Sequence, residues 1–134
     1  MDIQKTLSSA GLKCTKQRIA VMEVLLSSSG PITAEDIHSK VNEMSLSTVY
    51  RTVETLCNKH ILAKHTIQDS DKFYYDIVTE KHHHYAICLG CKSMRYIDHC
   101  PVHTADIDGF TVTGHKLEIY GYCNKCKNKN SVSN

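Results

Sequence analysis

The sequence predicts an α+β protein that has a winged helix-turn-helix in its first half and a zinc-binding segment in its second half. Apolar residues recur at helical spacing to about residue 57, and two segments of alternating polarity follow as a candidate hairpin. Two Cys-x-x-Cys pairs then occupy the second half, and this spacing suits a tetrahedral zinc ion.

Local signals delimit the first three predicted helices. Gly11 ends a short first helix, and Thr15 caps a second one. Gly30-Pro31 ends the second helix, and Thr-Ala-Glu-Asp at residues 33–36 forms a capping-box pattern that opens a third. The apolar positions that recur at helical spacing in the second helix are Ile19, Met22, Leu25 and Leu26.

Residues 47–57 form the most informative predicted helix. One apolar stripe contains Val49, Val53, Leu56 and Cys57. The opposite face is small, polar and nearly free of acidic residues, with Ser47, Thr48, Arg51, Thr55 and Asn58 on it and Tyr50 on its flank. This chemistry is what a helix in the DNA major groove requires, although an ordinary solvated helix face has a similar composition.

Two further features favour DNA binding. Strands expected at residues 63–67 and 72–78, joined by a turn at 68–71, would add a wing to the helices. Basic residues without an acidic neighbour open the second helix and could reach phosphates or a minor groove. The DNA-binding candidates are Lys13, Lys16, Arg18, Ser47, Thr48, Tyr50 and Arg51.

Composition limits the remaining possibilities. The net charge of the 134-residue chain is only +2, so any DNA-binding surface must be local. No signal peptide or transmembrane segment is predicted, and we expect a cytoplasmic protein with reduced cysteines. Paired cysteines in that setting indicate a metal site, here Cys88, Cys91, Cys123 and Cys126. Cys57 is expected in the core, and the roles of Cys14 and Cys100 stay open.

Three segments together carry a family resemblance: Gly-Leu-Lys-Cys-Thr-Lys-Gln-Arg at 11–18, Ser-Thr-Val-Tyr-Arg-Thr-Val at 47–53, and the histidine-rich run before Cys88. In this order they resemble the ferric uptake regulator (Fur) superfamily. Within it, residues 97–101 and 108–121 are most similar to the zinc uptake regulator (Zur) subgroup.

The resemblance implies a homodimeric repressor that binds double-stranded operator DNA and controls metal uptake genes. It implies a winged-helix DNA-binding domain over residues 1–78, a hinge over 79–81 and a metal-binding α/β dimerisation domain over 82–134. Tyr50 and Arg51 would read bases, and Lys13 and Arg18 would contact the backbone or minor groove. The cysteines would hold a structural Zn²⁺, and a second, regulatory divalent metal, expected to be Zn²⁺, would control DNA affinity.

By the same resemblance, the regulatory metal would be sensed by His82, His84, His103 and His115. A second, hinge site would use His65, Asp76 and His83, but Tyr85 stands where relatives place another histidine ligand, and tyrosine is a poor zinc ligand. A one-residue bulge would instead let His82 and His84 serve the hinge site, and the sequence does not separate the two assignments.

Other function classes fit less well. The motifs of zinc deaminases and of His-Glu-x-x-His metalloproteases are absent from the sequence, so we expect no enzyme activity, no small-molecule substrate and no membrane partner. An iron- or manganese-dependent peroxide or iron sensor of the same superfamily is the main alternative. A plain zinc-ribbon interaction module would leave the polar helix face and the extra histidines unexplained.

Overall fold

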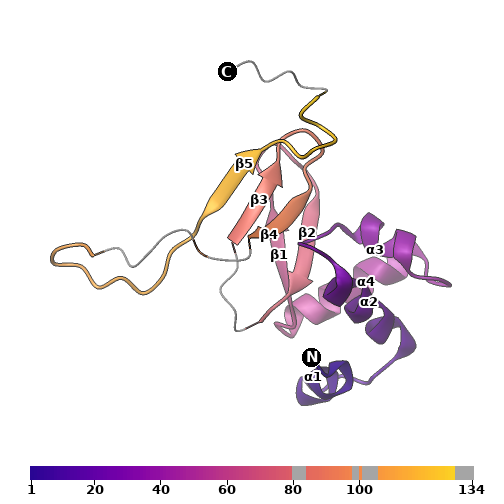
Figure 1. Ribbon diagram of the computed structural model, residues 1–134. Helices are drawn as coiled ribbons and strands as arrows, with labels where there is room; N and C mark the ends of the chain where they lie inside the picture. Colours follow the sequence, from indigo (N-terminus) through magenta and orange to yellow (C-terminus); the bar gives the residue numbers. More distant parts are fainter. Residues whose placement is uncertain (80–83, 98–99, 101–105, 129–134) are drawn as a thin grey trace. The chain divides into compact units, whose positions relative to one another are not determined.

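The computed structural model describes residues 1–79, 84–97, 100 and 106–128, which form two compact units, Met1–Thr79 and Glu80–Asn134 (Figure 1). The α+β class predicted from the sequence is confirmed, with four helices in the first unit and, among the described residues of the second, a three-stranded sheet. Among the described helices, none combines the length and apolar character needed to cross a lipid bilayer.

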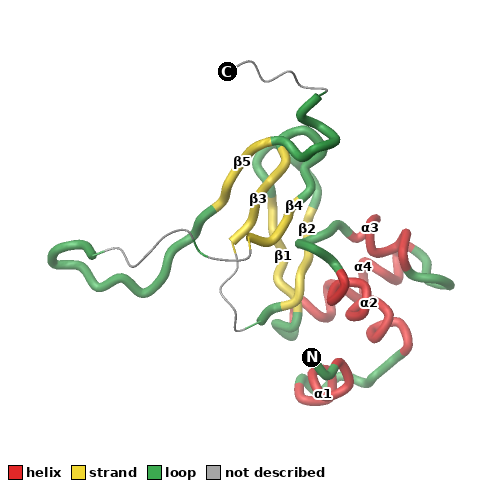
Figure 2. Tube along the Cα trace, in the orientation of Figure 1, coloured by secondary structure: helices red, strands yellow, loops and turns green. Residues whose placement is uncertain are grey.

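The first unit contains four helices followed by a hairpin (Figure 2). The helices are α1 (Ile3–Ser9), α2 (Lys16–Ser27), α3 (Ala34–Lys40) and α4 (Leu46–Asn58), and the antiparallel strands are β1 (Leu62–Thr66) and β2 (Phe73–Ile77). Each helix begins at a residue whose side-chain oxygen accepts a hydrogen bond from a backbone N–H of the first turn. These capping residues are Asp2, Thr15, Thr33 and Ser45.

The core of the first unit forms around the inner face of α4. Val49, Val53 and Leu56 are fully buried there, as the apolar stripe predicted. They belong to one cluster with apolar residues of α1, α2, α3 and the hairpin. Of the apolar residues at helical spacing in α2, Leu26 is 45% exposed, whereas Val21, which is outside that set, is fully buried.

The second unit is a small sheet with strand order β4-β3-β5. Strand β3 (His84–Cys88) pairs antiparallel with β4 (Met94–Ile97) and parallel with β5 (Glu118–Gly121). Its buried apolar side chains among the described residues are Ile87, Cys88 and Met94. So few side chains give little hydrophobic stabilisation, and a unit of this size needs a further cross-link such as a metal.

Candidate metal centres and nucleic-acid interface

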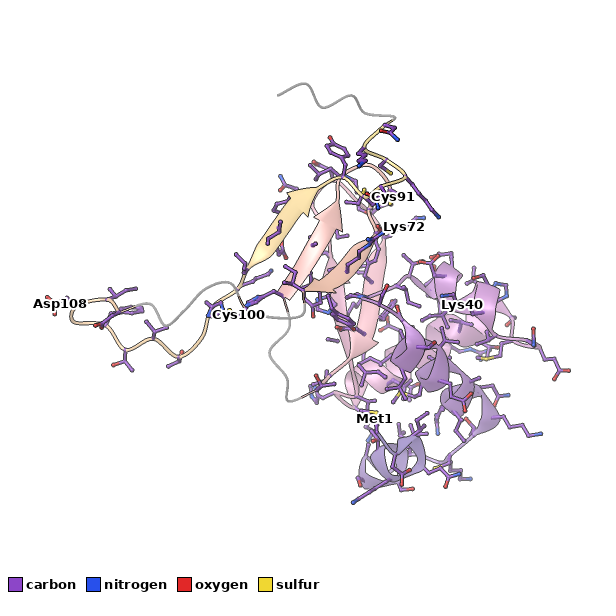
Figure 3. The ribbon with its side chains drawn as sticks, viewed as in Figure 1. Met1, Lys40, Lys72, Cys91, Cys100 and Asp108 are labelled. Atoms are coloured by element: carbon purple, nitrogen blue, oxygen red, sulfur yellow. The ribbon has the colours of Figure 1, made fainter. Side chains whose placement is uncertain are left out.

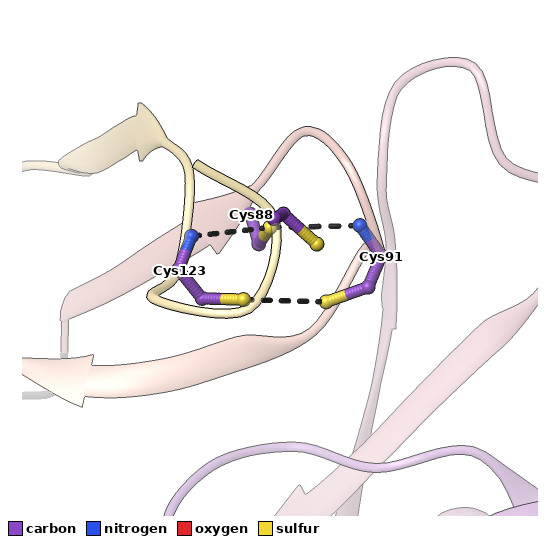
Figure 4. Close-up of side chains that lie close together, drawn as sticks. Cys88, Cys91 and Cys123 are labelled. Carbon is purple, nitrogen blue, oxygen red and sulfur yellow. Dashed lines mark hydrogen bonds between the residues drawn. The ribbon is translucent and has the colours of Figure 1, made fainter. Parts of the chain in front are cut away.

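The four cysteines of the Cys-x-x-Cys pairs converge at the end of the sheet where β3 and β5 finish. Cys88 is the last residue of β3 and pairs with Gly121, so that the chain leaving β5 brings Cys123 and Cys126 to it. All four sulfurs lie within 4.8 Å of one another, and the Sγ atoms of Cys91 and Cys123 are 3.9 Å apart (Figure 4). Zinc–sulfur bonds of about 2.3 Å place the sulfurs of a tetrahedral site about 3.8 Å apart, so this geometry suits zinc.

Backbone donors around this cluster favour thiolates, which are the form that binds metal. Burial opposes ionisation of the Cys88 thiol, but the N–H groups of Cys123 and Cys91 donate to its sulfur and lower its pKa to about 6. The pKa of Cys123 is lowered in the same way by the N–H of Cys126. A hydrogen bond to Cys123 raises the pKa of the Cys126 thiol to about 12, so without metal the cluster retains a proton that zinc would displace.

A second cluster, which we call the His84–Cys100–His115 cluster, lies at the opposite end of the same strands. His84 is the first residue of β3 and pairs with Ile97 at the end of β4, beyond which lies Cys100 (Figure 3). Strand β5 runs parallel to β3, so His115, just before β5, reaches the same place. The strand order therefore explains why residues from three separate segments meet.

The three potential ligand atoms form a nearly equilateral triangle. The Nε2 atom of His84 lies 3.0 Å from Nε2 of His115 and 3.1 Å from Sγ of Cys100, and the third edge is 3.1 Å. Edges of a tetrahedral zinc site with two imidazoles and one thiolate are about 3.3–3.6 Å, so a small expansion would admit the ion. His84 is 2% exposed, while His115 is exposed.

The structure brings together two of the four histidines predicted to sense metal, His84 and His115. His82 and His103 lie outside the described residues. Sequence reasoning missed Cys100, because no cysteine stands at a Cys-x-x-Cys distance from it. The only available signal was its residue type, in a chain already rich in metal-binding residues.

Two of the three residues predicted for the hinge site, His65 and Asp76, lie in contact in the first unit. Nε2 of His65 on β1 lies 2.7 Å from Oδ1 of Asp76 on β2, and Asp76 is buried. These residues are diagonal neighbours across the hairpin, because Ala63 pairs with Asp76 and His65 with Tyr74. His83, the third predicted ligand, lies outside the described residues, as does Glu80–Lys81 of the predicted hinge.

The polar outer face of α4 borders an open groove of about 310 Å³ next to the start of α2. Arg18 and Arg51 line it, and the Arg18 guanidinium is oriented by donating to the carbonyl oxygen of Lys13 at 3.0 Å. The other lining residues, which contribute only neutral hydroxyls and an amide, are Thr15, Gln17, Thr48, Thr52 and Thr55. A groove with two guanidinium groups and no acid among its lining residues suits a nucleic-acid phosphate.

Three further DNA-binding candidates, Lys13, Lys16 and Ser47, are exposed, but they do not line this groove. Tyr50 is 39% exposed and donates its phenolic hydrogen to the carboxylate of Glu35 on α3. This hydrogen bond lowers the pKa of Glu35 and raises that of Tyr50. Glu35 therefore binds Tyr50, a residue that the family resemblance assigned to base reading.

Comparison with known proteins identifies the family of this chain. The model of the ferric uptake regulator family matches residues 9–120, a span that includes α2, α4, the pair Cys88 and Cys91 and the whole His84–Cys100–His115 cluster, and that ends before Cys123 and Cys126. This chain belongs to the ferric uptake regulator family. Members of this family are metal-dependent transcriptional regulators that bind DNA, and the recognition made from the sequence is confirmed at that level.

Curated relatives of this chain carry names that refer to peroxide and to ferric uptake. The peroxide operon regulator of Bacillus subtilis is 34% identical over 93% of this chain and 91% of its own length. The ferric uptake regulation protein of Escherichia coli is 30% identical over 91% of this chain and 88% of its own length.

Two solved structures resemble the chain over most of its length. The ferric uptake regulator of Vibrio cholerae superposes with a TM-score of 0.71 at 26% identity, covering 91% of this chain and all of the other. A zinc-bound manganese uptake regulator gives 0.74 at 25% identity, covering 92% and 99%. The names of such relatives refer to iron, manganese, zinc and peroxide. They therefore do not identify the signal that this chain senses, and its own ligands are the better guide.

Proposed function

We propose that this protein is a zinc-dependent transcriptional repressor of the zinc uptake regulator type, which binds operator DNA as a homodimer in the cytoplasm and controls metal uptake genes. The observation that carries the proposal is the His84–Cys100–His115 cluster. The two imidazoles that converge there, those of His84 and His115, suit zinc and similar borderline cations, whereas iron(III) and manganese favour oxygen ligands.

The two clusters would have different tasks. Four thiolates close the coordination sphere of zinc, so the Cys88–Cys91–Cys123–Cys126 site would be structural and permanently filled. His84 and His115, with His82 and His103 as the further predicted ligands, would bind the regulatory ion reversibly. His115 is exposed, which gives the ion a route from solvent.

The DNA would bind to the first unit. Arg51 and Tyr50 on α4 would face base edges in the major groove, and Arg18 with Lys13 and Lys16 would contact phosphates or a minor groove. A dimer presents two such surfaces, and the regulatory ion would favour the arrangement in which both match operator spacing. By linkage, operator DNA would tighten metal binding by the same factor as metal tightens DNA binding.

The decisive experiment uses protein that carries one zinc per chain. With zinc added, this protein is first used to select the DNA duplexes that it binds from a random pool. Fluorescence anisotropy would then measure affinity for the selected duplex with zinc, iron(II), manganese or nickel added. We expect zinc to tighten binding by about 10–100-fold, within the usual range of allosteric coupling energies. Affinity that no metal changes would refute the proposal.

Variants separate the sensing and reading functions. His84→Ala and His115→Ala should lose the zinc response while keeping one zinc per chain, and His38→Ala on α3 serves as the matched control. Arg51→Ala should weaken binding to the selected duplex by about 1–3 kcal/mol, as loss of a bidentate base contact does. Loss of the last zinc in His84→Ala would mean that the ligands are wrongly partitioned.

A peroxide sensor is the second candidate, and two observations favour it. The peroxide operon regulator of Bacillus subtilis is a relative at 34% identity, and the His65–Asp76 pair offers the mixed nitrogen and oxygen ligands that iron(II) and manganese accept. The same anisotropy experiment would then show activation by iron or manganese, and brief treatment of the iron form with hydrogen peroxide would release DNA.

A further inference from the structure

We infer that Cys100 is a ligand of the regulatory metal, and that its sulfur restricts the site to thiophilic cations such as zinc and cobalt while disfavouring manganese. This inference rests on the proposed function, because it assigns the metal class of the same regulatory site. It differs from the sequence-based assignment, which used histidines alone.

The contacts within the cluster are the first argument. Three atoms approach one another pairwise at 3.0–3.1 Å, namely two imidazole nitrogens and one sulfur. A ring nitrogen of a neutral imidazole either donates or accepts, so at most two of these three contacts can be hydrogen bonds at one time. A central cation would accept a lone pair from each atom and satisfy all three contacts together.

Position in the fold is the second argument. His84 is 2% exposed at the start of the central strand, with β4 on one side and β5 on the other. Cys100 follows β4 and His115 precedes β5, so one ligand comes from each of the three strands or their immediate extensions. Because the ligands come from all three strands or their extensions, metal binding would hold these segments in one fixed arrangement.

Ligand softness gives the selectivity. Thiolate binds zinc, cobalt and copper strongly, whereas manganese(II) stands lowest in the stability order of first-row divalent ions and prefers oxygen. The same position filled by a carboxylate would remove this discrimination. Cys100 would therefore determine which cation activates the protein, and His84 and His115 would bind a broader range.

Cobalt(II) spectroscopy tests this inference directly. Protein carrying one zinc per chain, verified by metal analysis, is titrated with cobalt(II), because a sulfur ligand produces an intense sulfur-to-cobalt charge-transfer absorption in the near ultraviolet. We expect this absorption to appear in the native protein, to vanish in Cys100→Ser, and to persist in the control Cys14→Ser. Metal analysis after the titration shows whether the structural zinc has stayed in place.

Selectivity is measured on the same samples. Cys100→Asp should weaken cobalt and zinc binding by at least the roughly 10–100-fold that loss of a second-shell partner costs, and should raise manganese affinity relative to zinc. Unchanged charge-transfer absorption in Cys100→Ser, or an unchanged preference between zinc and manganese in Cys100→Asp, would overturn the inference.

A measurement on the native chain keeps the test valid if the variants misfold. Iodoacetamide should alkylate Cys100 in protein with one zinc per chain, and added zinc should protect it, as read by mass spectrometry; equal alkylation with and without added zinc would refute ligation. This failure is distinguishable from failure of the proposed function. If DNA affinity responds to zinc while Cys100 stays unprotected, only the inference about Cys100 is refuted.

Discussion

Three cysteines outside the Cys-x-x-Cys pairs have very different surroundings. Cys14 is exposed near the start of α2, and Cys57 lies half-buried against the core on α4. Cys100 lies within 3.1 Å of two imidazoles. Burial, and secondarily the charge of Glu54, raises the pKa of the Cys57 thiol to about 11.

Cys57 should therefore be slow to alkylate. With a pKa of about 11, only on the order of one thiol in a thousand is ionised near pH 8, and the thiolate is the reactive form. We expect mass spectrometry to find Cys14 modified by iodoacetamide well before Cys57, and the Cys57 rate to rise about tenfold per pH unit until the pH approaches its pKa. Equal rates for the two thiols near pH 8 would show that Cys57 is accessible and normally acidic.

Ligand residues differ in how far the sequence could predict them. Cys88 with Cys91, and Cys123 with Cys126, are recognisable because their spacing within each pair is local. Cys100 becomes a candidate only when β4 is known to end beside the start of β3, and no local pattern encodes that pairing. Spatial arrangement, and not residue type, was the missing information.

At the scale of elements, α4 ends in a Schellman motif built without glycine. The N–H of Ile61 donates to the carbonyl of Leu56, and the N–H of His60 donates to that of Cys57. His60 has φ of 60°, a left-handed conformation in which a side chain is disfavoured. Glycine is the residue that usually occupies this position.

Replacing His60 by glycine should stabilise the first unit. The substitution relieves the left-handed strain but increases the freedom of the unfolded chain, so we expect a net gain of up to about 1 kcal/mol in the free energy of unfolding. Urea denaturation followed by circular dichroism measures it. Asn58→Gly, two residues earlier at the last position of α4, is the control and should cost about 0.3 kcal/mol, because glycine is a poorer helix former than asparagine. Destabilisation by both changes would show that His60 makes a contact worth more than its strain.

Element boundaries were predictable where their signals are local. Thr15 and Thr33 cap α2 and α3 as expected, because a cap needs only the chain's own first turn. The inner face of α2 was predicted less well, since Leu26 satisfies the helical period yet is 45% exposed, whereas Val21 is buried. The parallel pairing of β5 with β3 is non-local and left no signature in either strand.

The two units of the molecule differ in how large an apolar core each one has. The first unit buries residues from all four of its helices and from its hairpin, whereas the second has few buried apolar side chains among the residues that the structure describes. Zinc binding at the four cysteines would therefore supply much of the folding free energy of the second unit.

Removal of zinc should unfold the units selectively. A strong chelator under reducing conditions is expected to abolish protection from hydrogen exchange in peptides covering β3 and β5, while peptides covering α4 stay protected. Mass spectrometry of exchanged peptides makes the measurement, and Cys126→Ser should reproduce the effect without chelator. Protection that persists in β3 after zinc loss would show that the sheet is stable by itself.

The parallel pairing of β3 with β5 also bears on the rate at which the second unit assembles. Residues 89–117 separate the two strands, and closing such a loop costs entropy before any strand hydrogen bond can form. The two clusters lie at opposite ends of this pair, so an ion captured early would hold β5 against β3 in the native register. A newly made chain without metal would then have a folded DNA-binding unit and an unformed second sheet. The supply of metal would determine the rate at which the protein matures.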